Sequence, residues 1–134
     1  MISFKTTSYF RKRLQTLTSF KRGVYAGVQD EIYTAFAGAP IEQIRQNRDM
    51  ILMQSDALVV KLRLPDRRQR LSKANGYRLI YLVSMIEERV AFLDVYPKRG
   101  PLQQLDITEE ELYRLLSLYV DEGKRNLLID YEYK

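Results

Sequence analysis

The sequence predicts an α+β fold, in which a short strand and a helical hairpin pack on an antiparallel β-sheet and a C-terminal helix follows. Changes in hydrophobic period predict this order. Apolar residues recur at helical spacing in the N-terminal third, alternate with polar residues from Ala57, and return to helical spacing after Thr108. The 134 residues are 46% hydrophobic and 29% charged, which suits one soluble domain over residues 1–122 with a tail over 123–134.

The N-terminal third is expected to hold a strand and three helices. Residues 2–6 are predicted to form a short strand, and Ser8 is a candidate N-cap for the first helix. The apolar positions of the first two helices follow helical spacing: Phe10, Leu14 and Leu17, then Tyr25, Val28, Ile32 and Phe36. Pro40 suits the first turn of a short third helix, from Ile41 to about Arg48. The tight turn at residues 21–23 predicts an antiparallel hairpin whose outer side carries Arg11, Lys12 and Arg13.

The middle of the chain is predicted to form a three-stranded antiparallel meander. In its first strand, Val60, Leu62 and Leu64 alternate with Val59, Lys61 and Arg63, so one face is apolar and the other carries cations. A long polar connection, residues 65–75, leads to a strand over residues 76–83. A turn at residues 84–88 leads to the third strand, residues 89–96. The N-terminal helices are expected to cover one face of this meander.

The C-terminal part is predicted to be one helix followed by a tail. Thr108 and Glu111 have the spacing of a capping box, and acidic residues are favourable in the first turn of a helix. The buried stripe of this helix is expected to consist of Leu112, Leu115, Leu116 and Tyr119. The tail after Gly123 is expected to be either disordered or an added strand.

Positive charge is concentrated in one part of the chain. Residues 1–99 hold eighteen Lys and Arg against nine Asp and Glu, whereas residues 100–134 hold four against eight, and the formal net charge is +5. Between residues 61 and 78 there is one carboxylate, Asp66, and there are seven cations: Lys61, Arg63, Arg67, Arg68, Arg70, Lys73 and Arg78. This clustering indicates a polyanionic partner, with RNA as the first candidate.

The composition excludes several classes of chemistry. Because the chain has no cysteine, it has no disulfide, no thiolate metal site and no cysteine nucleophile. It also lacks histidine, so zinc chemistry is disfavoured, and a general acid or base would have to be lysine, arginine, tyrosine or a carboxylate. No apolar run has membrane-spanning length and the N-terminus lacks the apolar core of a secretion signal, so a cytoplasmic protein without membrane contact is expected.

Three segments of the chain form a pattern: Lys61-Leu-Arg63, then residues 73–81 (KANGYRLIY), then residues 92–99 (FLDVYPKR). Together they resemble the RelE/ParE superfamily of toxins, and most closely its HigB/RelE-like branch. The resemblance implies a toxin of a type II toxin–antitoxin system. It would act as a ribosome-dependent mRNA endonuclease that needs no metal or cofactor and cleaves through attack of the ribose 2′-OH on the adjacent phosphate. The implied partners are the ribosome, its mRNA and a cognate antitoxin, expected to be a helix-turn-helix protein.

The same resemblance implies roles for individual residues. Arg78 would bind the scissile phosphate, and Lys98 would be the general acid at the leaving 5′-oxygen. Because neighbouring cations lower the pKa of a lysine, Lys61 and Lys73 are candidates for the general base, with Lys61 preferred for its place on a strand. The catalytic set is Lys61, Arg63, Arg78, Lys98 and Arg99. The expected RNA contacts are Arg67, Arg68, Arg70 and Lys73, with Tyr96 stacking on a base or donating a hydrogen bond.

Other interpretations stay open at this point. A toxin of the ParE kind, directed at DNA gyrase, shares the fold, since fold alone does not determine activity. A non-catalytic RNA- or partner-binding member of the family is the third possibility, because residues 100–105 lack a tyrosine that some relatives carry after the Lys-Arg pair. Purely structural roles are also possible: Arg78 could pair with Asp94, and the other cations could be solvated.

Overall fold

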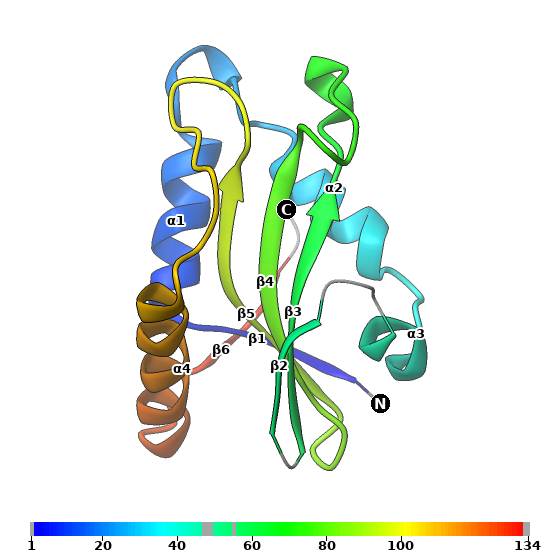
Figure 1. The fold of residues 1–134 in the computed structure, drawn as a ribbon, viewed down its shortest axis with the longest axis vertical. Helices are drawn as coiled ribbons and strands as arrows, with labels where there is room; N and C mark the ends of the chain where they lie inside the picture. Colours follow the sequence, from blue (N-terminus) through cyan, green and yellow to red (C-terminus); the bar gives the residue numbers. More distant parts are fainter. Residues whose placement is uncertain (1, 47–49, 55, 133–134) are drawn as a thin grey trace.

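The computed structural model describes residues 2–46, 50–54 and 56–132, and it confirms the α+β class, the mostly antiparallel sheet and the C-terminal helix (Figure 1). The strands are β1 (Ser3–Thr6), β2 (Met50–Gln54), β3 (Ala57–Leu64), β4 (Tyr77–Ser84), β5 (Arg89–Pro97) and β6 (Ile129–Asp130). The helices are α1 (Ser8–Thr18), α2 (Val28–Phe36), α3 (Ile41–Arg45) and α4 (Glu109–Lys124), with 3₁₀ turns η1 (Lys21–Gly23) and η2 (Arg67–Gln69).

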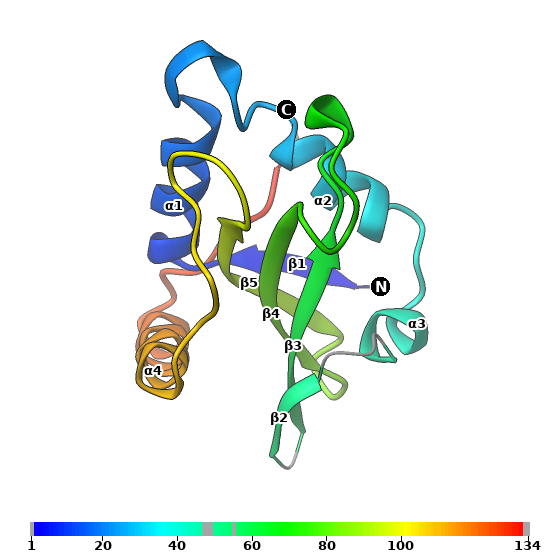
Figure 2. The same cartoon turned by 45° about the horizontal axis from the view of Figure 1, so that its top comes forward.

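The six strands form one sheet in the order β2-β3-β4-β5-β1-β6. Neighbouring strands are antiparallel except for β1 and β5, which are parallel. Two parts of the sheet differ from a simple meander. Strand β2, which the sequence did not predict, pairs with β3, and the tail contributes the short strand β6, which pairs with β1 at the opposite edge. In Figures 1 and 2, β1 crosses behind the upright strands β3, β4 and β5.

Helices pack on both faces of the sheet, whereas the sequence predicted cover for one. The N-terminal helices cover the face that carries Tyr77, Leu79 and Tyr81, and all three side chains are fully buried. Helix α4 covers the other face, where Leu112 and Leu115 pack with a group of side chains from β3, β4 and β5: Val59, Ile80, Leu82, Ala91 and Leu93. The alternation along β3 and β4 places Lys61, Arg63 and Arg78 on the α4 face as well.

Two helix N-termini show how α4 is held in place. The predicted capping box forms, since the Thr108 hydroxyl accepts from the Glu111 amide and the Glu111 carboxylate accepts from the Thr108 amide. The predicted cap of α1 is wrong by one residue, because Thr7 is the N-cap. Ser8 instead donates its amide, at 2.8 Å, and its hydroxyl to the buried carboxylate of Glu122 in α4. A carboxylate is stabilised at a helix N-terminus, so Glu122 fixes the end of α4 against α1.

The remaining differences concern helix limits. Helix α2 starts at Val28, because residues 25–27 form a turn after η1. Helix α3 ends at Arg45, and the last predicted positions of that helix lie outside the described residues. In the described ranges, no helix has the length and apolar character needed to cross a membrane.

Gly76, directly before β4, lies against the end of β3. A Cβ atom there would lie 2.1 Å from the Leu64 carbonyl oxygen and 2.7 Å from the Pro65 carbonyl carbon. The Gly76 carbonyl also accepts the amide of Lys98 at 2.8 Å. Because backbone atoms cannot move aside as a side chain can, glycine is required where the three segments meet.

We therefore expect Gly76→Ala to lower the free energy of unfolding by more than about 3 kcal/mol, since the clash involves backbone on both sides. Gly123→Ala is the control. Gly123 lies in helix α4, and a Cβ atom there would have one neighbour within 4 Å, the Leu128 side chain at 3.8 Å. There alanine should raise the free energy of unfolding by up to about 1 kcal/mol. Urea unfolding monitored by circular dichroism measures both. Equal midpoints for Gly76→Ala and the wild-type protein would contradict this account.

Candidate nucleic-acid interface

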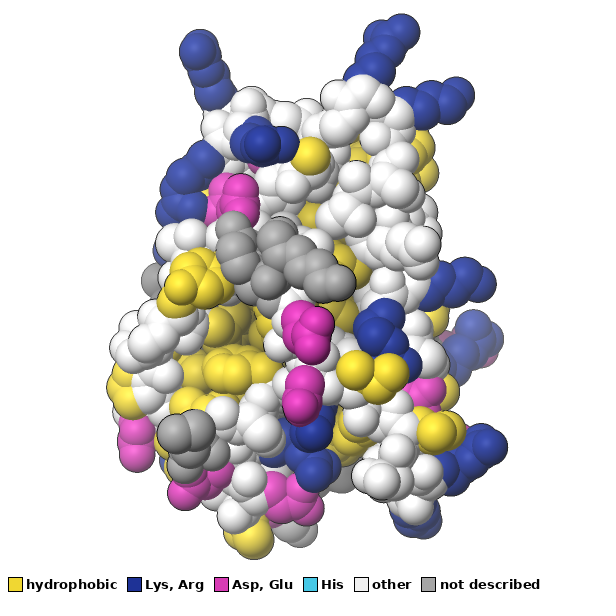
Figure 3. All heavy atoms as spheres, turned by 180° about the vertical axis from the view of Figure 1, so that it is seen from behind, with side chains coloured by type: hydrophobic (Ala, Val, Ile, Leu, Met, Phe, Trp, Pro, Cys, Tyr) yellow, Lys and Arg dark blue, Asp and Glu magenta, His cyan; other side chains and the backbone are white. Residues whose placement is uncertain are grey.

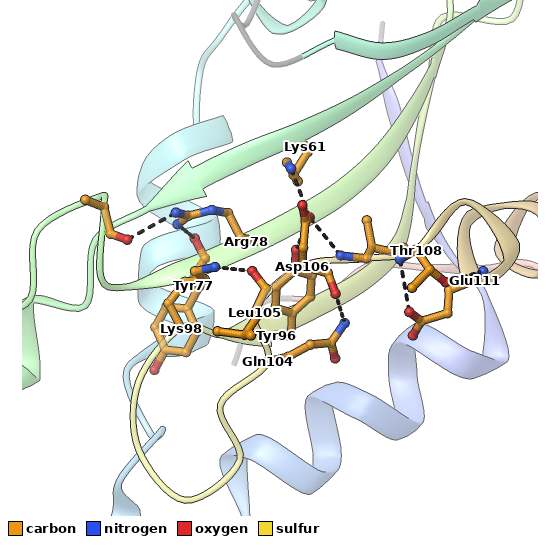
Figure 4. A network of polar contacts seen from close by, with 12 residues as sticks. Lys61, Tyr77, Arg78, Tyr96, Lys98, Gln104, Leu105, Asp106, Thr108 and Glu111 are labelled. Atoms are coloured by element: carbon orange, nitrogen blue, oxygen red, sulfur yellow. Dashed lines mark hydrogen bonds and ion pairs between the residues drawn. The ribbon is translucent and has the colours of Figure 1, made fainter.

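Strand pairing brings the predicted cations onto one face of the sheet. Arg63 of β3 lies opposite Arg78 of β4, and Arg78 lies opposite Tyr96 of β5. Lys61 precedes Arg63 by two residues and Lys98 follows Tyr96 by two, so period two predicts the same face for both. Figure 4 shows Lys61, Arg78, Tyr96 and Lys98 around a common centre. Like charges directly opposite each other destabilise a sheet, so this arrangement is not one that stability alone favours.

A carboxylate that sequence reasoning missed lies in the middle of these cations. The Asp106 Oδ1 atom accepts the Lys61 ammonium at 3.0 Å, the Tyr96 hydroxyl at 3.4 Å and the Ile107 amide at 2.8 Å. The Asp106 side chain is 64% exposed. One sequence signal could have pointed to it: Asp106 is the single carboxylate between the Lys98-Arg99 pair and the capping box of α4.

Charge interactions adjust the protonation of this cluster. The pKa of Lys98 is lowered, first by burial and then by the charges of Arg78, Lys61 and Arg99, while Asp106 opposes the change. Burial raises the pKa of Asp106, but hydrogen bonds from Lys61 and the Ile107 amide, together with the cationic charges, outweigh it and leave that pKa lowered. Lys98 also donates a hydrogen bond to the Leu105 carbonyl. The cluster therefore joins an ionised carboxylate to an ammonium that releases its proton more readily than a free lysine.

Arg78 contributes to the cluster as a fixed charge. It is 7% exposed, and its guanidinium donates to the carbonyls of Lys73 at 2.9 Å, Ala74 at 3.1 Å and Tyr77 at 3.2 Å. Arg78 therefore stabilises the turn that precedes β4. Its guanidinium N–H groups point to the carbonyls of this turn, which leaves fewer of them to bind a phosphate. Asp94, the alternative partner considered for Arg78, forms an ion pair with another residue.

That partner is Arg13 of α1, which the sequence placed on the outer side of the helix. The guanidinium of Arg13 meets the Asp94 carboxylate at 3.1 Å, where the Asp94 side chain is 3% exposed, and burial raises the pKa of Asp94. Arg13 also donates to the Gln104 side chain at 2.9 Å, and Gln104 in turn donates to the Asp106 carbonyl at 3.1 Å. This chain of contacts connects a buried ion pair to the segment that carries Asp106.

The predicted base-stacking role of Tyr96 is wrong for this structure. The Tyr96 side chain is fully buried between the sheet and the segment leading to α4, so its ring offers no surface to a base. Its hydroxyl points to Asp106 instead, and burial is the main cause of its raised pKa. Tyr96 therefore helps to position the Asp106 carboxylate.

A second basic feature is the end of the molecule where three connections meet. Residues 21–23, 65–75 and 98–105 lie at this end, at the top of Figures 1 and 2, and lysine and arginine side chains project from it at the top of Figure 3. In these three segments the single carboxylate is Asp66, which is buried. We name their seven exposed cations the basic rim: Lys21, Arg22, Arg67, Arg68, Arg70, Lys73 and Arg99. The sequence pattern predicts a turn at Lys21 and Arg22 but gives no sign that they join the other cations.

Buried side chains hold the segments of the basic rim in place. The Tyr25 hydroxyl donates to the Arg99 carbonyl at 2.9 Å and accepts the Leu102 amide at 3.0 Å. The buried Glu31 carboxylate accepts the Arg67 amide at 2.8 Å and pairs with the Arg67 guanidinium. Asp66 accepts the Tyr77 hydroxyl at 2.8 Å. Because these anchors fix the backbone beneath the cations, an anion would meet preformed positive loops.

No protein-family model matches the chain, and no curated protein shows significant similarity to it. The case for function therefore rests on the cation cluster, Asp106 and the basic rim. In the described residues, no group of three or more acidic side chains is placed to hold a metal ion.

The Tyr25 anchor gives a direct test. Tyr25→Phe should lower the free energy of unfolding by about 1–2 kcal/mol, because the Arg99 carbonyl and the Leu102 amide lose the hydroxyl of the buried Tyr25 as their partner. Hydrogen exchange should quicken at Leu102 and its neighbours more than in β4. Tyr113→Phe, at an exposed position of α4, is the control and should change neither quantity. Unchanged exchange of residues 99–103 in Tyr25→Phe would show that the hydroxyl does not hold this connection.

Proposed function

We propose that the protein is a metal-independent RNA endonuclease of the RelE/ParE type, acting as the mRNA-cleaving toxin of a toxin–antitoxin system. The convergence of Lys61, Arg78 and Lys98 on one sheet face, next to the basic rim, is the observation that supports the proposal most. Neither the cation cluster nor the basic rim depends on histidine or cysteine, which the chain lacks. The family assignment rests on the sequence resemblance and on an α+β architecture that agrees with it.

Cleavage through the ribose 2′-OH makes demands that this cluster can meet. The attack builds negative charge on the phosphate oxygens, and fixed cations on a rigid sheet stabilise that charge without reorganising. Arg78 is held by three carbonyls and Arg63 lies directly opposite it. The leaving 5′-oxygen needs a proton, and Lys98, with its lowered pKa, is the best-placed donor.

The basic rim would hold the RNA backbone. Its cations are exposed, belong to three separate connections and are not distributed along a single helix face. Contacts of this kind bind phosphates without reading sequence, so codon or sequence choice would have to come from the ribosome or from other surfaces. The antitoxin expected from the resemblance, a helix-turn-helix protein, would silence the toxin by covering one or both basic surfaces.

One observation favours a second candidate, a non-catalytic RNA-binding protein. Lys61, Arg78 and Lys98 all donate to acceptors inside the protein, and the segment after Arg99 lacks a tyrosine. A protein that only binds RNA would need no more than the basic rim. Cleavage and binding therefore have to be measured separately.

Induced expression tests the nuclease proposal. The wild-type protein should arrest growth and fragment messages, with new 5′ ends that fall in frame with codons. Lys98→Met should reduce cleavage by a factor of about 100 or more, because the proton donor and a cation are lost together. Lys12→Met, an exposed lysine of α1, is the control and should behave as wild type. Mapping messenger 5′ ends measures cleavage by the wild-type protein and by both variants. A DNA-damage response with intact messages would indicate a gyrase poison instead.

Binding to a single-stranded RNA oligonucleotide tests the basic rim. Arg70→Ala should weaken binding to all sequences alike and reduce the slope of log K against log salt by about 0.7, the value for one lost phosphate contact on a single strand. Arg125→Ala is the control, because Arg125 pairs with Asp121 at the far end of α4. Fluorescence anisotropy at several salt concentrations gives both slopes. A change of equal size in the two variants would argue against the basic rim as the RNA surface.

A further inference from the structure

The candidate site supplies cations and a proton donor, but the predicted general base does not fit the structure. Lys61 is the donor in an ion pair, and a protonated amine cannot accept a proton. Lys73 is exposed on the turn that precedes β4, where its carbonyl, not its ammonium, contacts the cluster. The 2′-OH must lose a proton as it attacks, so the reaction needs an acceptor that neither lysine provides.

We propose that Asp106 is the catalytic base, accepting the proton of the attacking 2′-OH. This inference rests on the proposed endonuclease function. Of the carboxylates in the described residues, Asp106 is the one that contacts Lys61 and Tyr96 and acts on the charge of Lys98. The nearby Asp94 is buried and paired with Arg13, so substrate cannot reach it.

The hydrogen bonds of Asp106 suit this role. Its contacts from Lys61, Tyr96 and the Ile107 amide all fall on Oδ1. The other oxygen, Oδ2, is left without a partner in the part of the chain that the structure describes, on a side chain that is 64% exposed. One oxygen is therefore anchored while the other can accept a proton. Gln104 holds the backbone of the same residue through the Asp106 carbonyl, which fixes the carboxylate further.

The charge balance still favours a phosphate. Arg78, Lys61 and Arg99 all act on Lys98, and Asp106 is the single carboxylate that opposes them there. One negative charge among four positive ones leaves the cluster cationic, so substrate binding does not require Asp106 to leave. A carboxylate within a cationic site also remains ionised near neutral pH, as a base must.

The proton and electron movements balance without a co-reactant. The 2′-OH proton moves to Asp106 as the bond from the 2′-oxygen to phosphorus forms. The bond from phosphorus to the 5′-oxygen breaks, and that oxygen takes a proton from the Lys98 ammonium. The products are a 2′,3′-cyclic phosphate and a 5′-hydroxyl end, and exchange with water returns a proton to Lys98 and removes one from Asp106.

Asp106→Asn tests the assignment, because it keeps the size of the side chain and removes its basicity. Single-turnover cleavage of the mRNA in programmed ribosomes should slow by a factor of about 100 or more, as expected for loss of a general base. Affinity for the same message carrying a 2′-deoxy nucleotide at the cleavage position should not fall. Asp130→Asn is the matched control, since Asp130 is also an exposed carboxylate paired with a lysine, Lys5, but lies at the β6 edge of the sheet.

The outcomes are distinguishable. Loss of cleavage with retained affinity in Asp106→Asn alone supports the inference. Cleavage at the wild-type rate by Asp106→Asn overturns it while leaving the endonuclease proposal intact. Tighter binding together with faster cleavage also overturns it, because the carboxylate would then be occupying the place of the phosphate. If the wild-type protein leaves the message intact, the proposed function fails and the inference fails with it.

Discussion

The ion pair between Lys61 and Asp106 is the contact on which the candidate site depends. The register of β3, β4 and β5 brings several cations onto one face, and like charges held together on a partly buried surface repel one another. Asp106 offsets part of this repulsion and ties the connection before α4 to the sheet. An exposed ion pair contributes only about 0–1 kcal/mol to stability, so this pair matters more for the position of Asp106 and for the charge of the site than for the stability of the fold.

Rigidity in this region comes from buried contacts beneath the cations. Tyr25, Glu31 and Asp66 hold the basic rim from inside, and Arg13 with Asp94 holds the segment that leads to Asp106. The exposed charges therefore stand on fixed backbone even though their own side chains are long. A surface of this kind loses little conformational freedom when an anion binds, which favours both affinity and the orientation that chemistry needs.

Local pattern predicted much of the fold. Alternation along residues 57–64 predicted β3 and its cationic face, and the spacing of Thr108 and Glu111 predicted the start of α4. Contacts between distant segments could not be predicted in this way. Arg13 and Asp94 are 81 residues apart, and Lys61 and Asp106 are 45 apart, so no local period signals either pair. For the same reason the burial of Tyr96 and the packing of α4 on the cationic face appeared only in the structure.

The most direct test of the account is a crystal structure of the Asp106→Asn variant bound to an RNA oligonucleotide. The account predicts a phosphate between Lys61 and Lys98, with the adjacent 2′-hydroxyl within hydrogen-bond reach of the substituted side chain, at about 2.6–3.2 Å. It also predicts neighbouring phosphates along the basic rim. RNA bound on another surface, or held by the basic rim while the cluster stays closed on its internal acceptors, would contradict it.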